Sequence, residues 1–231
     1  MTVQATFRPV AEHALLVSFA AEISEAAHAQ VLTLEQAIAT AAPAGVVETV
    51  PALVNLLVCF DVLTTDHAAV ELAVRALLRE PHSEGVSGRT HRVAVCYEPP
   101  FAPDLDAVAS ATGLGAEAVI NAHLAGDYHV LMYGFAPGYA YLGGLPDSIR
   151  VPRKPAPVRD VPAGSVIIAG SQCLVTTLVM PTGWSIIGRS PTPILTGQAD
   201  RPFLFDVGDR VVFDRIGLDA CERLMSGHTH V

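Results

Sequence analysis

Cysteine, lysine and charged residues are scarce in this 231-residue sequence. Its four cysteines are far apart and form no Cys-x-x-Cys pair, so neither a zinc site nor a disulfide framework is indicated, and we expect no metal site. The single lysine, Lys154, lies between Arg153 and Pro155 and lacks the flanking methionines of a biotinylation site, so we expect no biotin on this chain. The net charge of −9 argues against binding to nucleic acid or to an anionic membrane.

Motifs of several common enzyme classes are also absent. The sequence has no Gly-x4-Gly-Lys-Ser/Thr loop, no Gly-x-Gly-x-x-Gly, no His-Glu-x-x-His and no Gly-x-Ser-x-Gly. P-loop, dinucleotide-binding, zincin and α/β-hydrolase interpretations therefore lack their motifs. Residues 1–8 do not resemble a secretory signal, and Asn55 and Asp61 interrupt the longest apolar run, so we expect a cytoplasmic protein without a membrane segment.

The predicted elements divide the chain into two parts, and we expect an α+β protein. Residues 1–88 combine extended segments with two amphipathic helical patterns, which Ser24 and Asp66 can cap, and this part reads as a small α/β domain. Residues 79–89 have the composition of a linker. Residues 89–231 hold two short helical patterns and then many short apolar runs between turn signals, which is typical of a barrel or a sandwich. The expected strands there are 92–97, 165–169, 174–179, 184–188 and 210–213.

Residues 133–145 contain four glycines, one proline and four aromatic residues. Glycine and proline disfavour helices and central strands, so we expect a shaped loop with no regular strand in it. Glycines allow a backbone to approach a ligand closely while rigid rings form walls, which favours a small-molecule pocket. An ordinary tight loop with core aromatics is the alternative. The candidate binding residues in this segment are Phe135, Pro137, Gly138 and Tyr141.

Basic residues gather between Pro146 and Pro193, although the whole chain is acidic. Five bases and two acids give this stretch a local charge of +3. A basic segment in an acidic protein suggests a site for a carboxylate or a phosphate, and solvated surface arginines are the alternative. The strongest candidates are Arg153, Arg159 and Arg189, because a guanidinium offers a rigid fork of donors.

Four further residues are site candidates. His123 ends a helical pattern just before the aromatic loop, where it would serve as an acid, a base or a donor, or simply as a structural histidine. Ser165 and Gln172 flank one predicted strand, and we expect both at the same end of the barrel as the arginines. Gln172 would orient a carbonyl or an amide. Trp184 follows Pro181-Thr182-Gly183 as a candidate pocket wall, although core packing is the more usual role of tryptophan.

Several long motifs, taken in order, carry a family resemblance. They are Gly134-Phe135-x-Pro137-Gly138, Tyr141-Leu142-Gly143-Gly144-Leu145, Pro152-Arg153 through Arg159, Val161-Pro162-Ala163-Gly164-Ser165-Val166, Ala169-Gly170-x-Gln172, Gly183-Trp184-x-x-Ile187-Gly188-Arg189 and Pro202-Phe203-x3-Val207-Gly208-Asp209. The chain resembles the allophanate hydrolase subunit 1 family, which includes the B component of 5-oxoprolinase, a urea-carboxylase segment and a sporulation-kinase inhibitor.

The resemblance implies a small α/β domain followed by a cyclophilin-like β-barrel. It also implies a homologous second subunit, of the type of allophanate hydrolase subunit 2 or the C component of oxoprolinase. The oxoprolinase version has a third subunit and opens a lactam at the expense of ATP, with Mg²⁺ expected beside the nucleotide. The basic residues would receive phosphate or substrate carboxylate, and His123 and Gln172 would contact the amide. The leading hypothesis is therefore a multi-subunit, ATP-dependent hydrolase acting on a C–N bond of a small amide.

Two other functions fit the same resemblance. One is a regulatory protein that inhibits a histidine kinase, and the other is a carboxyltransferase component that uses biotin carried by another chain. Residues 173–180 also depart from the family, because they replace a more usual Gly-Ile-Tyr-Pro segment beside the expected pocket. This departure leaves the choice among lactams, other cyclic amides and ureido acids open.

Overall fold

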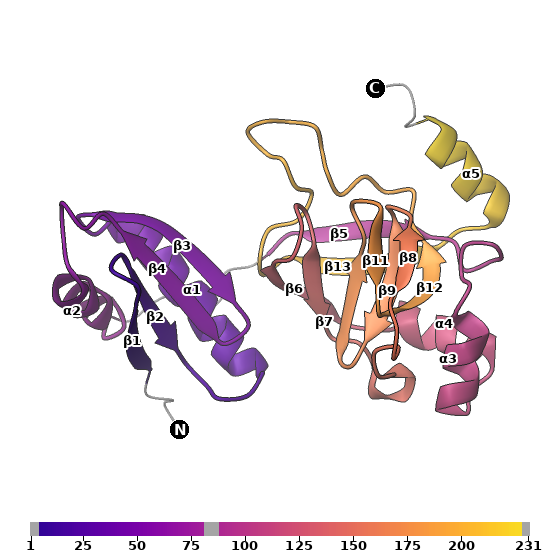
Figure 1. Ribbon diagram of the computed structural model, residues 1–231, viewed down its shortest axis with the longest axis horizontal. Helices are drawn as coiled ribbons and strands as arrows, with labels where there is room; N and C mark the ends of the chain where they lie inside the picture. Colours follow the sequence, from indigo (N-terminus) through magenta and orange to yellow (C-terminus); the bar gives the residue numbers. More distant parts are fainter. Residues whose placement is uncertain (1–4, 81–87, 228–231) are drawn as a thin grey trace. The chain divides into compact units, whose positions relative to one another are not determined.

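The computed structural model describes residues 5–80 and 88–227, and the chain separates into two compact units, Met1–Ser87 and Gly88–Val231 (Figure 1). Most of the expected linker, residues 79–89, lies outside the described residues. Both units mix helices with strands that pair mainly antiparallel, as an α+β fold requires. None of the helices in the described ranges has the length and apolar character that a membrane crossing needs.

Unit 1 is an antiparallel sheet covered on one face by two helices. The strands run in the order β1 (Thr6–Val10), β2 (Ala14–Ser18), β4 (Asn55–Phe60) and β3 (Val46–Ala52), and the helices are α1 (Glu25–Ala41) and α2 (His67–Leu77). Alternate residues of β2 and β4 are buried, and they share one hydrophobic cluster with both helices. The predicted caps are confirmed, since Ser24 Oγ accepts from the Ala27 N–H and Asp66 Oδ1 from the Ala69 N–H.

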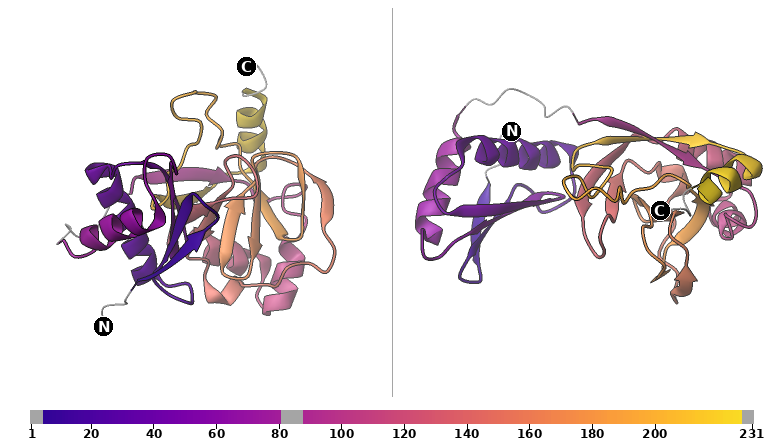
Figure 2. Two further views of the ribbon diagram at one scale, coloured as in Figure 1. Left: turned by 60° about the vertical axis from the view of Figure 1, so that its left-hand side comes forward. Right: turned by 90° about the horizontal axis from the view of Figure 1, so that it is seen from above.

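Unit 2 is built on a longer, mostly antiparallel sheet. β5 (Thr90–Val95) and β13 (Arg210–Arg215) run parallel and side by side (Figure 2), and β13 also pairs with β6 (Tyr128–Tyr133). The order then continues through β7 (Ala140–Gly143), β10 (Gln172–Val175), β9 (Ser165–Ala169) and β12 (Ser185–Arg189). An isolated bridge pairs Cys96, just after β5, with Arg189 at the end of β12. A closed cyclophilin-like barrel remains a prediction.

Both faces of this sheet are buried around its strand β9. On one face, Val166 and Ile168 of β9 join a large core with α3 (Leu105–Thr112), α4 (Ala116–Leu124) and the 3-10 turn η1 (Asp147–Ile149). On the other face, Ile167 and Ala169 join a smaller cluster that includes residues of the two-stranded sheet formed by β8 (Val158–Val161) and β11 (Met180–Thr182). Every residue of β9 is therefore buried, so this strand is a rigid support for side chains at its ends.

Two predictions about the elements of unit 2 are wrong. Residues 133–145 contain a strand, β7, which lies in the sheet between β6 and β10. Its Ala140 and Leu142 are buried while Tyr141 and Gly143 are half-buried, so side chains alternate between two faces as in a regular strand. The strand expected at 174–179 stops at Val175, where Thr176 Oγ1 bonds back to the main chain of the neighbouring turn. The helix α5 (Leu218–Gly227) is an element that we did not predict.

Candidate functional site

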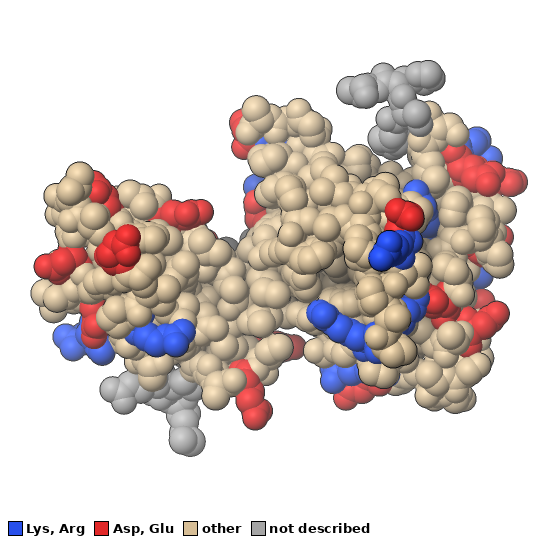
Figure 3. Space-filling view, in the orientation of Figure 1, with Lys and Arg blue, Asp and Glu red and all other residues tan. Residues whose placement is uncertain are grey.

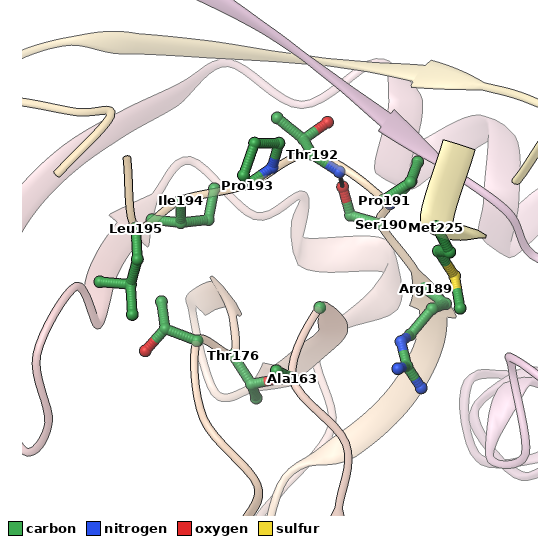
Figure 4. A pocket seen from close by; sticks show the side chains of 12 residues that line it. Ala163, Thr176, Arg189, Ser190, Pro191, Thr192, Pro193, Ile194, Leu195 and Met225 are labelled. Carbon is green, nitrogen blue, oxygen red and sulfur yellow. Dashed lines mark hydrogen bonds between the residues drawn. The ribbon is translucent and has the colours of Figure 1, made fainter. Parts of the chain in front are cut away.

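An open pocket of about 440 Å³ lies in unit 2, at the end of the sheet where β9 begins and β12 ends (Figure 4). The strand register explains the position, because Arg189 pairs with Ser165 and the turn before Ser165 carries Gly164. Four segments supply the lining: residues 163–164, residues 176–177, residues 189–195 and Met225 of α5. The pocket thus brings one cation, several hydroxyl groups and an apolar wall together.

Arg189 is held firmly at one end of this pocket. Its main chain exchanges two hydrogen bonds with Cys96, with N···O distances of 2.8 and 2.9 Å. Its guanidinium carbon lies 5.8 Å from the centre of the Phe101 ring. Gly164 has φ +83°, and a Cβ there would lie 2.4 Å from the Ser190 carbonyl oxygen and 3.3 Å from Arg189 Nε. Glycine at this position lets the turn approach Arg189 without a clash.

The Arg189 guanidinium carries an uncompensated charge. Partial burial lowers the pKa of Arg189 from its ordinary value because the charged form loses solvation. Within residues 5–80 and 88–227, no carboxylate lies within ion-pair distance of this side chain, whereas Arg150 and Arg215 each have one. A half-buried cation of this kind is a favourable place for an anionic ligand.

The hydroxyl groups of the pocket mostly hold the neighbouring turns in place. Thr176 Oγ1 donates to the Pro162 carbonyl at 2.9 Å and accepts from the Ser165 N–H at 2.9 Å. Ser190 Oγ accepts from the Thr192 N–H at 3.1 Å, the bond drawn in Figure 4. These bonds preorganise the pocket, since its lining is fixed before any ligand arrives.

The aromatic loop forms the edge of the pocket opposite Arg189. The Pro137 carbonyl accepts a 2.6 Å bond from Thr177 Oγ1. Gly138 has φ +74°, and a Cβ there would lie 2.7 Å from Leu195 Cδ2 and 3.0 Å from Thr177 Cγ2, both of which belong to lining residues. Phe135 is 71% exposed, with its ring 5.7 Å from that of Tyr139. The predicted residues Pro137 and Gly138 therefore contact the lining residues Thr177 and Leu195 without lining the pocket themselves. Ser165 is buried behind the lining, where its hydroxyl donates to the Pro162 carbonyl.

A second group of predicted residues lies apart from the residues that line this pocket. The Arg153 guanidinium lies 5.7 Å from the centre of the Trp184 ring, and Tyr141 meets Trp184 edge-on at 5.9 Å. Trp184 is only 6% exposed and belongs to the smaller hydrophobic cluster, so most of its surface packs in the protein. Arg153 and Arg159 are exposed, and basic side chains gather on the face of unit 2 that carries β8 and β11 (Figure 3).

The structure does not bring Gln172 to the Arg189 pocket. Gln172 pairs with Ala169, while Ser165 pairs with Arg189, so the two predicted residues stand at opposite ends of β9. The four residue steps from Ser165 to Ala169 span about 13 Å at the usual rise of a strand. The expectation that both flanks of this strand reach one end of the sheet was wrong, because the two ends of a strand point in opposite directions.

His123 lies in the core of unit 2, where it has no exposed surface. Its Nδ1 lies 2.8 Å from Tyr97 Oη, and its Nε2 lies 3.4 Å from Cys173 Sγ. Burial lowers the pKa of His123 to about 3 and raises that of the Cys173 thiol, so both groups are held neutral. A reactive cysteine needs the opposite shifts, so this His–Cys contact is inert.

The pocket does not fit a magnesium–nucleotide complex by itself. At the Arg189 end, the N–H groups of Gly164, Arg189, Ser190 and Thr192 are all bonded to atoms of the protein. A polyphosphate site usually offers free main-chain N–H groups and a carboxylate for the metal. In the part of the chain that the structure describes, no three His, Cys, Asp or Glu side chains are grouped so that they could hold a metal ion.

Comparison with known proteins identifies the family. The model of the carboxyltransferase domain, subdomain C and D, matches residues 5–205, which include the strands and the arginine of the pocket. This chain belongs to that carboxyltransferase-domain family. The B component of the 5-oxoprolinase of Bacillus subtilis (strain 168) is 35% identical over 227 residues, which cover 94% of this chain and 95% of the relative. The family resemblance seen in the ordered motifs is confirmed.

Solved structures place the same fold in longer chains. The structure of TTHA0988 is 32% identical with a TM-score of 0.78, and the match covers 89% of this chain and 40% of that chain. The urea amidolyase of Kluyveromyces lactis gives a TM-score of 0.79 at 16% identity, and the match covers 97% of this chain and 16% of that chain. At this low identity the second likeness shows the fold alone.

Proposed function

We propose that this chain is one part of an ATP-dependent hydrolase complex of the 5-oxoprolinase type, which opens a C–N bond of a small cyclic amide together with a related second subunit. The observation that carries the proposal is the 35% identity to the B component of a 5-oxoprolinase over nearly the full length of both chains. The preorganised pocket at Arg189 supports it, because this pocket offers a small anionic substrate a counter-charge and an apolar wall.

The energetic problem in this reaction is the stability of the lactam. Phosphorylation of the amide oxygen would convert a poor electrophile into an activated imidate, and water would be the nucleophile in its hydrolysis. The role of this chain in the complex is to bind and orient the substrate. We place the nucleotide away from the Arg189 end of this pocket, since the N–H groups of Gly164, Arg189, Ser190 and Thr192 are already bonded. We also infer a cyclophilin-like barrel for unit 2, supported by the Cys96–Arg189 bridge.

The test is ATP-dependent turnover of 5-oxoproline by the protein co-purified with its genomic neighbours. Glutamate release and ADP formation are measured in the same samples, and we expect them to rise together. Avidin is added in a parallel reaction, where a biotin-dependent carboxyltransferase would lose its activity and the proposed hydrolase would not. Absence of glutamate from a complex whose assembly has been verified by gel filtration would overturn the proposal.

A further inference from the structure

We propose that Arg189 binds a carboxylate on the substrate and thereby selects cyclic amides that carry one, an inference that rests on the proposed function. The site consists of the Arg189 guanidinium at one end of the pocket and an apolar wall toward Leu195 at the other (Figure 4). Arg189 would thus determine specificity by binding a part of the substrate that does not react.

The first argument is the state of the Arg189 charge. The side chain is half-buried and has lost part of its solvation, yet no described carboxylate compensates it. A carboxylate can accept two parallel hydrogen bonds from the guanidinium fork, and the pair is strengthened where water is partly excluded. Phe101 on one side and the turn at Gly164 on another restrict where the fork can lie, so less entropy is lost on binding.

The second argument favours a carboxylate over a phosphate. A phosphate ester presents more acceptor oxygens and more charge than one guanidinium satisfies, so phosphate sites add main-chain N–H donors. Here the N–H groups of Gly164, Arg189 and Ser190 bond to the carbonyl oxygens of Thr176, Cys96 and Gly164. Those donors are occupied, so the positive charge of the lining comes from the Arg189 side chain. This single charge matches the single negative charge of a carboxylate.

The third argument is the character of the rest of the lining. Besides Arg189, Ser190 and three threonines, the lining has apolar side chains away from Arg189 that suit the methylene groups of a small ring. These residues are Pro193, Ile194 and Leu195, whereas Pro191 and Met225 are apolar residues close to Arg189 and Ser190 (Figure 4). The volume of about 440 Å³ lies toward the small end of the range for ligand pockets, which is about 300–1,000 Å³. A compact lactam with one anionic substituent fits this division into a charged end and an apolar end.

The experiment compares two ligands that differ in the carboxylate alone, 5-oxoproline and 2-pyrrolidone, on the assembled complex. Affinities are measured by calorimetry without ATP, so the binding result does not depend on turnover. The variants are Arg189→Gln and Arg189→Lys, with Arg223→Gln as the matched control because Arg223 is exposed on α5. Circular dichroism melts verify that each complex is folded.

We expect Arg189→Gln to weaken 5-oxoproline binding by about 10- to 100-fold, because a charge-assisted hydrogen-bond pair is lost. The affinity of Arg189→Lys for 5-oxoproline should lie between those of Arg189→Gln and the wild type, since lysine keeps the charge but lacks the forked pair of donors. Binding of 2-pyrrolidone should not change in any variant, and Arg223→Gln should behave as the wild type. In turnover assays, KM for 5-oxoproline should rise more than kcat falls.

Three outcomes would overturn the inference: unchanged 5-oxoproline binding in Arg189→Gln, equal losses for both ligands, or no binding of 5-oxoproline by the wild-type complex. The proposed function fails differently. If the wild type binds 5-oxoproline through Arg189 but releases no glutamate with ATP, the carboxylate site stands and the hydrolase proposal falls. If turnover is normal and Arg189→Gln binds normally, the hydrolase stands and the carboxylate site falls.

Discussion

Arg189 is partly buried and His123 is wholly buried, but within the described residues only the His123 side chain has hydrogen-bond partners for its polar atoms. His123 is neutral and meets Tyr97 and Cys173, so its polar atoms have partners inside the core. Arg189 keeps its charge at the edge of a pocket and has no described carboxylate beside it. A satisfied buried group stabilises the fold, whereas an uncompensated one at a cavity is available to a ligand.

The burial of His123 predicts a pH dependence of stability. The pKa of His123 falls from 6.5 to about 3 on folding, so the unfolded chain binds one more proton between these values. The free energy of unfolding therefore keeps its full value above pH 6.5 and decreases on acidification. The loss from this residue should be about 1.4 kcal/mol per pH unit, or about 2 kcal/mol at pH 5.

The measurement is urea unfolding of unit 2 at several pH values between 7 and 5. His123→Gln should lower stability at pH 7, because it disturbs a fully buried contact, but it should flatten the dependence on pH by about one proton. His129→Gln is the control, since the His129 side chain is 40% exposed. An equally steep pH dependence in His123→Gln and in the wild type would contradict the prediction.

At the scale of single residues, the sequence indicates the chemistry of a side chain but not which end of a strand it occupies in the fold. The sequence predicts Arg189 as an anion-binding residue and Ser165 at the same end of the sheet, and the strand register does pair the two. The anion site itself stays a prediction. The sequence could not show that Gln172 lies at the opposite end of β9, since pairing partners are set by the tertiary fold. Thr176, Ser190 and Met225 were missed as lining residues, because their place beside Arg189 depends on how distant segments pack in the fold.

Helices and strands could be predicted where residues close in sequence, such as caps and apolar stripes, determine them. The helices α1 and α2 have caps and apolar stripes, and both lie where the sequence indicates. The strand β7 was missed because its glycines and aromatics are typical of a loop, yet its neighbours β6 and β10 supply the hydrogen bonds that a strand needs. The helix α5 was missed although Leu218, Cys221 and Met225 recur at helical spacing, which is a local signal that could have predicted it.

One side chain, Asp104, links α3 to β12 and to the loop that carries Lys154. Asp104 Oδ2 accepts from Lys154 Nζ at 2.5 Å and from the Ile186 N–H at 2.7 Å, which ties the start of α3 to β12 and to the basic segment. Asp104→Ala should lower the free energy of unfolding by about 2–3 kcal/mol, because it leaves the Ile186 N–H and the Lys154 ammonium without this acceptor.

Chemical denaturation of Asp104→Ala tests this link, with Asp106→Ala as the control. Asp106 is an exposed acid in the first turn of the same helix, so its loss should cost at most about 1 kcal/mol. A double-mutant cycle with Lys154→Met then separates the ion pair from the bond to Ile186. Equal losses for the two aspartate variants would show that Asp104 links nothing and acts only at the helix end.

At the scale of the whole molecule, the comparisons show one fold in two settings. It spans nearly all of the B component of a 5-oxoprolinase but 16% of a urea amidolyase chain. What such a fold does is therefore decided by its pocket and by the chains beside it. Here all the residues that line the pocket belong to unit 2. Whether unit 2 folds without unit 1 therefore decides whether the pocket can form without unit 1.

Unit 2 should fold without unit 1. The two large hydrophobic clusters are composed of residues from one unit each, and β5, β13 and α5 all belong to the chain after residue 88. A fragment of residues 88–231 is long enough to bury a core of its own, so we expect dispersed amide resonances and cooperative unfolding in urea. Ile168→Ala, in the buried strand β9, should lower its midpoint, since a cavity is left behind. A fragment that bound hydrophobic dyes and unfolded without a transition would show instead that unit 1 is required for the sheet that holds Arg189.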